Sequence, residues 1–355
     1  MVVGAGVAGL SAAWRLAAAG REVVVLERFA LGHDRGSSHG ATRIFRFAYA
    51  DPVYVRLARA ALPLWRELED VTGSEILRVT GGLDAGPGEA LDAISSALDA
   101  CGAAAEVLDA PETRRRFPWL TLGETPALFS RDTGVLAAAR ALDALANAAR
   151  AGGADIREER PVRSLSIEGD GVAIETDAGA IRARRCVVAA GAWANELLAP
   201  LDFAIPLRVT REQVFYFRGP DDVVPFIHHG ELSRYCVPAF AGAAGIKVAE
   251  HMTGEPTSAE GRSFDMDPEG AARVAAYVEG TLPGCDPEPV ALETCLYSNT
   301  PDEGFVLDAV GPLIVSSACS GHGFKFGPIV GEILAGLGTG REPPLPLAPF
   351  SLDRF

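Results

Sequence analysis

The stretch MVVGAGVAGLSAAWRLAAAGREVVVLE, residues 1–27, decides the fold of this chain. It opens with an apolar strand fragment and continues into the pattern GxGxxG. The alanine-rich residues 10–19 predict a helix, which Gly20 ends. The β-branched run in residues 21–27 predicts a buried parallel strand. The order strand, helix, strand is that of the β-α-β unit that binds dinucleotides.

Each glycine of that pattern has its own task. Gly4 permits the tight turn, Gly6 lets a pyrophosphate approach the backbone, and Gly9 lets the helix pack closely on the strand. The positive end of the helix dipole then faces the phosphates. Glu27 ends the second strand, where a carboxylate accepts hydrogen bonds from ribose hydroxyls. The alternative is a plain glycine turn beside a surface glutamate, and the pattern alone does not separate FAD from NAD.

Hydrophobic periodicity predicts further helices and short strands along the rest of the chain. Helices are expected at residues 51–73, 90–101, 137–151, 267–281 and 329–338. Strands are expected at residues 77–83, 154–158, 162–167, 172–176, 180–182, 186–190, 213–217, 234–237 and 313–318. The strands at 186–190 and 313–318 would return to the first β-α-β unit. The predicted fold class is therefore α/β: a Rossmann-like, doubly wound domain, split in sequence, with an inserted antiparallel β-sheet domain.

The chain has 355 residues, a length that fits about two domains. We predict that residues 1–78, 131–203 and 288–355 form the discontinuous nucleotide-binding domain. Residues 79–130 and 204–287 would form the substrate domain, which carries the catalytic groups.

Composition excludes several classes of partner. The net charge of −15 argues against nucleic acid, although a pocket in an acidic protein can still be locally positive. No apolar run approaches the roughly 18 residues of a membrane span. The six cysteines show no CxxC spacing, so we expect no metal site. No secretory signal precedes the first strand, so we expect a cytoplasmic protein. That strand is short, and we expect the natural start to lie upstream of Met1.

Lysine is almost absent. Of the 32 basic residues, only Lys247 and Lys325 are lysines, and arginine supplies every other fixed positive charge. A compact ammonium with a tunable pKa is therefore expected to be needed at these two positions, with chance survival as the alternative.

Three segments carry a family resemblance. They are GSSHGATRIFR at residues 36–46, ETCLYSNTPDE at residues 293–303 and SGHGFKF at residues 320–326. In order and spacing they resemble the monomeric sarcosine oxidase and N-methyltryptophan oxidase family, within the superfamily of FAD-dependent oxidoreductases that resemble D-amino acid oxidase. The resemblance covers the whole chain and is weakest at residues 84–130 and 219–233.

The resemblance implies that the nucleotide is FAD and that the discontinuous domain is an FAD-binding domain. In this family a cysteine thiolate bonds to the 8-methyl carbon of the flavin, and the matching residue is Cys295; a buried free cysteine is the alternative. His39 and Arg43 match residues near the flavin ring, where a cation raises the electron affinity of the flavin. Further cofactor contacts are implied for Ser37, Thr42, Val162, Gly321, Gly323 and Phe324.

The family also implies a set of catalytic residues. Lys325 and Arg46 match the pair that clamps the substrate carboxylate, and an ordinary ion pair is the alternative for Arg46. Lys247 matches the site of oxygen activation, where a positive charge stabilises the charge that develops on dioxygen. His251 matches a histidine that orients the substrate amine. Tyr235, Tyr297 and Phe47 match the substrate pocket, with core packing as the alternative.

Departures from the family leave the substrate open. Phe47 and Gly304 stand where the sarcosine enzymes commonly carry histidine, and residues 225–229 align poorly with the family's substrate loop. These changes leave room for a bulkier N-methyl or a cyclic secondary amino acid. The expected reaction is oxidation of a secondary amino acid by a monomer, with O2 as the acceptor and an imine and hydrogen peroxide as products. The alternatives are a biosynthetic flavoprotein that oxidises a pipecolate-like imino acid, a subunit of an amine dehydrogenase, and a non-catalytic nucleotide-binding protein.

Overall fold

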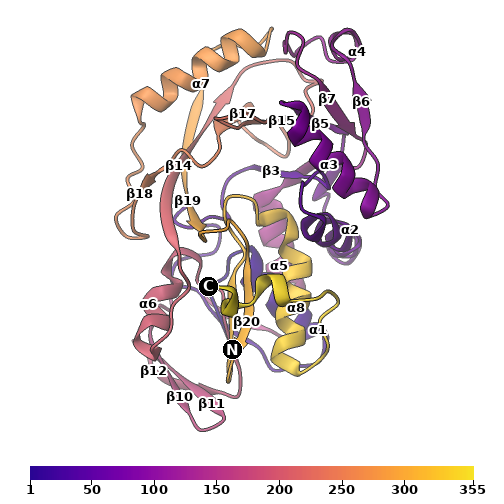
Figure 1. Ribbon diagram of the computed structural model, residues 1–355. Coiled ribbons are helices and arrows are strands. Elements are labelled where there is room, and N and C mark those ends of the chain that lie inside the picture. The colour runs from indigo at the N-terminus through magenta and orange to yellow at the C-terminus, as the bar shows by residue number, and fades with distance from the viewer.

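The computed structural model describes residues 1–355 and contains two large sheets with helices packed against them (Figure 1). The first sheet has six strands in the order β20-β21-β13-β1-β2-β9. Their bounds are β20 Val306–Val310, β21 Leu313–Ser317, β13 Cys186–Val188, β1 Val2–Val3, β2 Val24–Leu26 and β9 Asp155–Arg157. All neighbours are parallel except β20, which runs antiparallel to β21. This order joins strands from both ends of the chain and confirms the doubly wound domain split in sequence.

Helix α1 (Val7–Ala18) follows β1 and packs between two other helices, α5 (Ala138–Ala151) and α8 (Gly327–Thr339). Most of α1 and α8 is buried because both helices are apolar nearly all round. The largest hydrophobic core of the molecule lies here, under α2 (Pro52–Thr72) and around β1, β2 and β21. Burial of this apolar area fixes the start of α1, and with it the glycine turn, against the end of the sheet.

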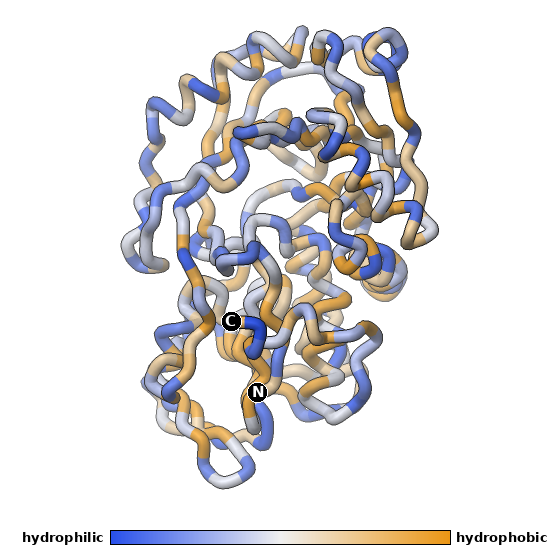
Figure 2. The backbone as a smooth tube through the Cα atoms, in the orientation of Figure 1, coloured by the Kyte–Doolittle hydropathy of each residue, from blue (hydrophilic) through white to orange (hydrophobic).

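The second sheet has nine strands, in the order β18-β14-β17-β16-β15-β5-β7-β6, with β19 also paired to β14. Their bounds are β18 Glu255–Pro256, β14 Arg208–Phe217, β17 Ile246–Glu250, β16 Arg234–Val237, β15 Phe226–His228, β5 Gly82–Ala85, β7 Ala127–Ser130, β6 Glu106–Leu108 and β19 Ala291–Asn299. Every pair is antiparallel except β15 with β5. Helix α7 (Pro268–Thr281) covers one end of the sheet, and its hydropathy alternates along the tube in Figure 2, because Val274 and Val278 face the core.

The remaining elements are shorter. A three-stranded sheet joins β3 Thr42–Phe45, β8 Gly134–Ala137 and β4 Leu77–Val79, and another joins β10 Val162–Glu168, β11 Gly171–Thr176 and β12 Gly179–Ala183. The other helices are α3 Gly88–Ala100, α4 Ala110–Arg116 and α6 Ala194–Leu198, with short 3₁₀ turns at Gly191–Trp193, Ala199–Leu201, Phe324–Phe326, Ala348–Phe350 and Leu352–Arg354. No helix is both long and apolar enough to cross a membrane.

The structure differs from the prediction at residues 77–83, where the sequence predicts one short strand interrupted by the Gly81-Gly82 pair. The chain turns at Gly81, whose φ is +72°, so that β4 and β5 belong to two different sheets. The strand β19 lies in the range predicted for the FAD-binding domain, yet it pairs along its whole length with β14 of the second sheet. The division into domains stays a prediction.

Candidate active site

One cavity of about 380 Å³ extends from the start of α1 to the second sheet. Its wall comes from the turn after β1, the loop at residues 36–46, strands β16, β17 and β19, and the turn before α8. These segments are far apart in the sequence, and only the packing of the two sheets brings them together. A large, mostly apolar cavity lined by a few charged groups is the usual form of a cofactor and substrate site.

The nucleotide end of the cavity is built around Glu27. Its carboxylate accepts hydrogen bonds from the backbone N–H of Ala5 at 2.7 Å and of Phe29 at 3.0 Å. Burial raises the pKa of Glu27, but hydrogen bonds from His33 and from these two backbone groups outweigh burial and hold the pKa below its usual range. Glu27 is therefore an anion at the end of β2, as a ribose-binding carboxylate requires.

Two of the three glycines of the pattern line the cavity, and the third packs the helix against the turn. Gly4 and Gly6 line the cavity, and Gly4 has a φ of +97° in the turn. Gly9 does not line the cavity, because it lies against the carbonyl of Gly4, where an added Cβ would collide with that oxygen. Its position agrees with the helix-packing task expected of the third glycine.

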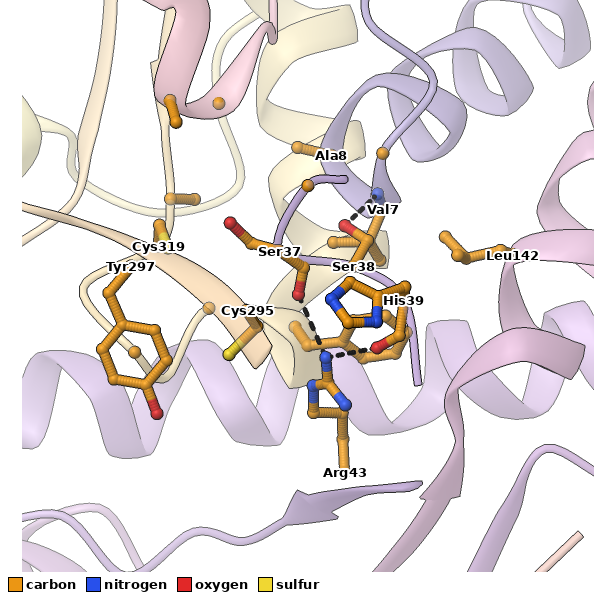
Figure 3. A pocket seen from close by; sticks show the side chains of 18 of the residues that line it. Val7, Ala8, Ser37, Ser38, His39, Arg43, Leu142, Cys295, Tyr297 and Cys319 are labelled. Atoms are coloured by element: carbon orange, nitrogen blue, oxygen red, sulfur yellow. Dashed lines mark hydrogen bonds between the residues drawn. The ribbon is translucent and has the colours of Figure 1, made fainter. Parts of the chain in front are cut away.

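Hydrogen bonds hold the loop at residues 36–46 over the start of α1 (Figure 3). The Ser38 hydroxyl accepts from the Val7 N–H at 3.1 Å, and the Ser37 hydroxyl donates to the Leu296 carbonyl at 2.6 Å. Arg43 Nη2 donates to the carbonyls of Ser37 at 3.0 Å and His39 at 2.6 Å. Arg43 thus fixes the loop and at the same time places a permanent positive charge in the cavity wall.

Two buried polar atoms of this loop have no partner within the protein, namely His39 Nε2 and Thr42 Oγ1. Buried polar atoms are nearly always hydrogen-bonded, so both are suited to bind a cofactor. Burial lowers the pKa of His39 to about 3, and the charges of Arg43 and Arg262 add to the effect. His39 is therefore neutral, and of the two residues that were predicted to lie near the flavin only Arg43 is a cation.

Cys295 lies on β19, directly across from Glu212 of β14, and its side chain lines the cavity (Figure 3). Burial raises the pKa of its thiol to about 11, although the charges of Arg43 and Lys247 act in the opposite direction. The thiolate is the nucleophilic form of cysteine. Before any cofactor binds, Cys295 is therefore an accessible but protonated thiol.

Lys247 stands on β17 and is 3 % exposed. Its Nζ donates to the Thr42 carbonyl at 2.6 Å, which ties the second sheet to the loop at residues 36–46. Burial, and to a smaller extent the charge of Arg43, lowers the pKa of Lys247. Glu293 and Cys295 act in the opposite direction, and the resulting pKa is about 7. Lys247 is therefore only partly protonated at neutral pH, and a nearby negative charge would stabilise its ammonium form.

Lys325 and Arg46 meet at one aromatic ring. Lys325 Nζ donates to the Tyr49 hydroxyl and to the His322 carbonyl, each at 2.7 Å. The Arg46 guanidinium lies 4.5 Å from the centre of the Tyr49 ring. Burial lowers the pKa of Lys325 well below its usual value, and the charge of Arg46 adds to the effect. Two basic groups that contact the same tyrosine and both line the cavity form a site in which a bound anion would favour the charged form of Lys325.

The predicted pocket aromatics divide into two groups. Tyr235, Tyr297 and His251 line the cavity, and the rings of His251 and Tyr297 lie 5.7 Å apart. Burial, with the charges of Arg46 and Lys325, lowers the pKa of His251 to about 4, so its imidazole is neutral. Phe47 is not in the cavity: it is 7 % exposed and packs edge-on against Phe45 in the core. Neighbouring side chains of extended chain point in opposite directions, so Phe47 points away where Arg46 points in.

The remaining predicted cofactor residues all line the cavity: Val162, Gly321, Gly323 and Phe324.

Sequence reasoning missed Tyr49, Asp84, Glu293 and His229. Tyr49 and Glu293 carry no motif of their own, although Glu293 opens a quoted segment. Asp84 directly follows the short strand predicted at residues 77–83, where an acid is usually a solvent-exposed residue. Its Oδ1 accepts from Arg46 Nη1 at 2.8 Å, and the carboxylate is 2 % exposed.

Comparison with known proteins identifies the family. The sequence profile described as FAD dependent oxidoreductase matches residues 1–337. The chain belongs to the FAD-dependent oxidoreductase family. This oxidoreductase is 34 % identical to the peroxisomal sarcosine oxidase of Homo sapiens over 374 residues, which cover 100 % of this chain and 95 % of that protein. It is 32 % identical to the monomeric sarcosine oxidase of Arthrobacter sp. over 372 residues, with the same coverage. These relatives confirm the resemblance drawn from the three segments.

A solved structure extends this comparison to the fold. NikD, an unusual amino acid oxidase essential for nikkomycin biosynthesis, superposes on the oxidoreductase with a TM-score of 0.88 and 27 % identity. The match covers 99 % of this chain and 96 % of that one. The two-sheet architecture is therefore that of a known flavoenzyme fold.

The residues present fit FAD. The turn after β1 and the start of α1 line the cavity, where the positive end of the helix dipole favours a pyrophosphate, and Glu27 is placed for a ribose. The unpartnered His39 Nε2 and Thr42 Oγ1 lie farther along the same cavity, beside Arg43. A dinucleotide bound at the glycine turn would therefore extend toward Cys295 and the two lysines.

Proposed function

We propose that this chain is an FAD-dependent oxidase of secondary α-amino acids, in particular N-methyl amino acids, and that it produces an imine and hydrogen peroxide. One observation carries the proposal: the only two lysines of the chain, together with Arg46, line the same cavity as the glycine turn. When bound, FAD supplies the acceptor for the hydride removed from the substrate carbon, and O2 reoxidises it. Water then hydrolyses the imine to an aldehyde and an amine.

In this proposal Arg46 and Lys325 bind the substrate carboxylate. Their distances to Tyr49 support a shared anion site, because both side chains contact the same residue. A carboxylate there would accept hydrogen bonds from both groups and would restore the charge of Lys325, whose pKa burial lowers. The gain is orientation: the amine end of the substrate is held in one place relative to the cofactor.

His251 is proposed to orient the substrate amine. Its neutral imidazole can accept a hydrogen bond from an amine N–H, which an imidazolium cannot do. The rings of Tyr235 and Tyr297 complete an apolar wall on the same side of the cavity. This wall would exclude water from the reacting carbon.

Lys247 is proposed to meet dioxygen. Its burial and its hydrogen bond to the Thr42 carbonyl hold Nζ in a fixed place, so the protonated form of Lys247 would carry its positive charge at one position before the reaction starts. A dehydrogenase that passes electrons to a partner protein needs no such cation, which favours the oxidase over the dehydrogenase subunit. The full set of Arg46, Lys325 and Cys295 is equally unnecessary in a non-catalytic nucleotide-binding protein.

We further propose that the flavin is bonded covalently to Cys295 and that the enzyme acts as a cytoplasmic monomer. The accessible thiol in the cavity wall supports the bond, and six unpaired cysteines are in keeping with a reducing compartment. The raised pKa of the thiol means that attachment would be faster at higher pH. Light scattering on the purified enzyme measures its mass and thereby tests the monomer.

The decisive experiment for the function is peroxide release from a panel of substrates. Sarcosine, N-methyl derivatives of larger amino acids, L-proline and L-pipecolate are each supplied to the purified enzyme in air. Peroxide with N-methyl amino acids supports the proposal, and peroxide with the cyclic compounds alone would favour the pipecolate-like alternative. Flavin reduction without peroxide would identify a dehydrogenase, and no flavin reduction by any of these compounds would overturn the proposal.

A further inference from the structure

A buried carboxylate stands behind the proposed substrate site. Asp84 Oδ1 accepts two hydrogen bonds, from Arg46 Nη1 and from His229 Nε2, each at 2.8 Å. Both donors line the cavity, whereas Asp84 itself does not. Asp84 is 2 % exposed, so the two donors replace the water that the carboxylate has lost.

The chain builds this arrangement through the one parallel pair of the second sheet. In the pairing of β5 with β15, Asp84 lies next to Ile227, and the His229 N–H donates to the Ala85 carbonyl at 2.7 Å. Gly86 has a φ of +152°, and a Cβ there would lie 2.7 Å from the His229 carbonyl oxygen. The close approach of His229 therefore depends on a glycine. Residues 225–229 are also the segment that departs from the sarcosine oxidase pattern.

The ion pair changes the charge that the cavity offers to a substrate. The positive charge of Arg46 is already balanced by Asp84 at 2.8 Å. Arg234, another cation of the cavity wall, lies 3.4 Å from Glu250, a carboxylate that also pairs with Arg273 at 3.0 Å. No carboxylate lies within ion-pair distance of Lys325, whose Nζ donates hydrogen bonds to Tyr49 and to His322.

A single substrate carboxylate would thus meet Lys325, which has no carboxylate partner, at this end of the cavity. Arg46 would serve as a further hydrogen-bond donor. A second carboxylate placed beside Arg46 would meet a guanidinium whose charge Asp84 already balances, and it would face Asp84 across Arg46. Burying an unpaired anion is costly, and like charges repel strongly where water is excluded.

We propose that Asp84 is a specificity-determining residue, which restricts the substrates to secondary amino acids with a single carboxylate by balancing the charge of Arg46 and fixing His229. Asp84 acts through these two residues and touches no substrate atom. The inference rests on the proposed function, because it assigns the substrate class of that same site.

The test compares two ligands of equal size that differ in one charge. Succinate and its mono-amide, succinamate, are titrated into the holoenzyme, and their dissociation constants are measured from the change in flavin absorbance. We expect the native enzyme to bind succinamate about tenfold more tightly than succinate, and Asp84→Asn to abolish or reverse this preference. Asparagine keeps an oxygen for Arg46 and His229 and removes only the charge.

Two further variants separate charge from structure. Asp84→Glu restores the charge and should restore the preference for succinamate. Glu67→Gln is the matched control: Glu67 pairs with Arg15 at 2.6 Å, and neither residue lines the cavity, so the preference should not change. The ratio of kcat/KM for iminodiacetate to that for its mono-amide should rise in Asp84→Asn alone.

The outcomes decide the proposal independently of turnover. If Asp84→Asn retains flavin and discriminates between succinate and succinamate as the native enzyme does, Asp84 does not set the charge preference. If Asp84→Asn does not fold, the native holoenzyme still decides, because equal or tighter binding of succinate would overturn the proposal. If no amino acid is oxidised, the proposed function fails, while the two affinities still report on Asp84.

Discussion

Substitution of Lys247 by methionine would remove the charge proposed to meet dioxygen and would keep the length of the side chain. Lys247 is 3 % exposed and is held by one hydrogen bond to the Thr42 carbonyl, so methionine fits with the loss of that bond alone. A unit charge about 4 Å from the charge that develops on dioxygen contributes about 4 kcal/mol at an effective dielectric constant of about 20. Loss of that stabilisation corresponds to a reoxidation rate about a thousandfold lower.

The assay separates the two half-reactions. The enzyme is first reduced by substrate without air in a stopped-flow instrument and is then mixed with oxygenated buffer, and flavin absorbance is followed in both steps. We expect Lys247→Met to slow the second step and leave the first nearly unchanged, and Lys247→Arg, which keeps a positive charge, to recover part of the rate. Reoxidation of Lys247→Met at the native rate would refute the role of this ammonium group in oxygen activation.

Three further predictions concern the same cavity. Lys325→Ala should raise KM for carboxylate substrates by about 10- to 100-fold, because a charged hydrogen bond is lost. An equal rise in KM for an amine without a carboxylate would count against the binding of the substrate carboxylate by Lys325. The native reoxidation rate should fall as pH rises through about 7, since burial lowers the pKa of Lys247 to that value and only the protonated form acts; in stopped-flow traces of Lys247→Met this pH dependence should be absent. Cys295→Ser should release its flavin into the supernatant on acid precipitation while the native protein pellet stays yellow, and release from both would show that no covalent bond forms.

The sequence alone predicts the first β-α-β unit well, for a local reason. The helix and the strands that follow the glycine turn arise from short-range periodicity and from glycines at fixed spacing, which few other structures use. The scarcity of lysine likewise singles out Lys247 and Lys325 without any structural information. The glycine pair at residues 81–82 predicts an interruption of this strand, but the pairing of its two parts with different sheets was not foreseen, because that pairing depends on strands distant in the sequence.

Side-chain direction and charge state could not be derived from the residues. Resemblance assigned Phe47 to the pocket, yet the packing of the core turns it away from the cavity. A cationic role was expected near the flavin for His39, whose pKa burial lowers to about 3. The importance of Asp84 was not visible at all, because it depends on β15 pairing with β5.

The sequence by itself therefore determined the nucleotide-binding unit, the family and the identity of the two lysines. The tertiary structure decided which polar groups are buried together, which of them carry charge, and which cations already have a partner. The physical reason is that spacing along the chain controls local conformation, whereas desolvation and ion pairing depend on segments that meet only when the two sheets pack.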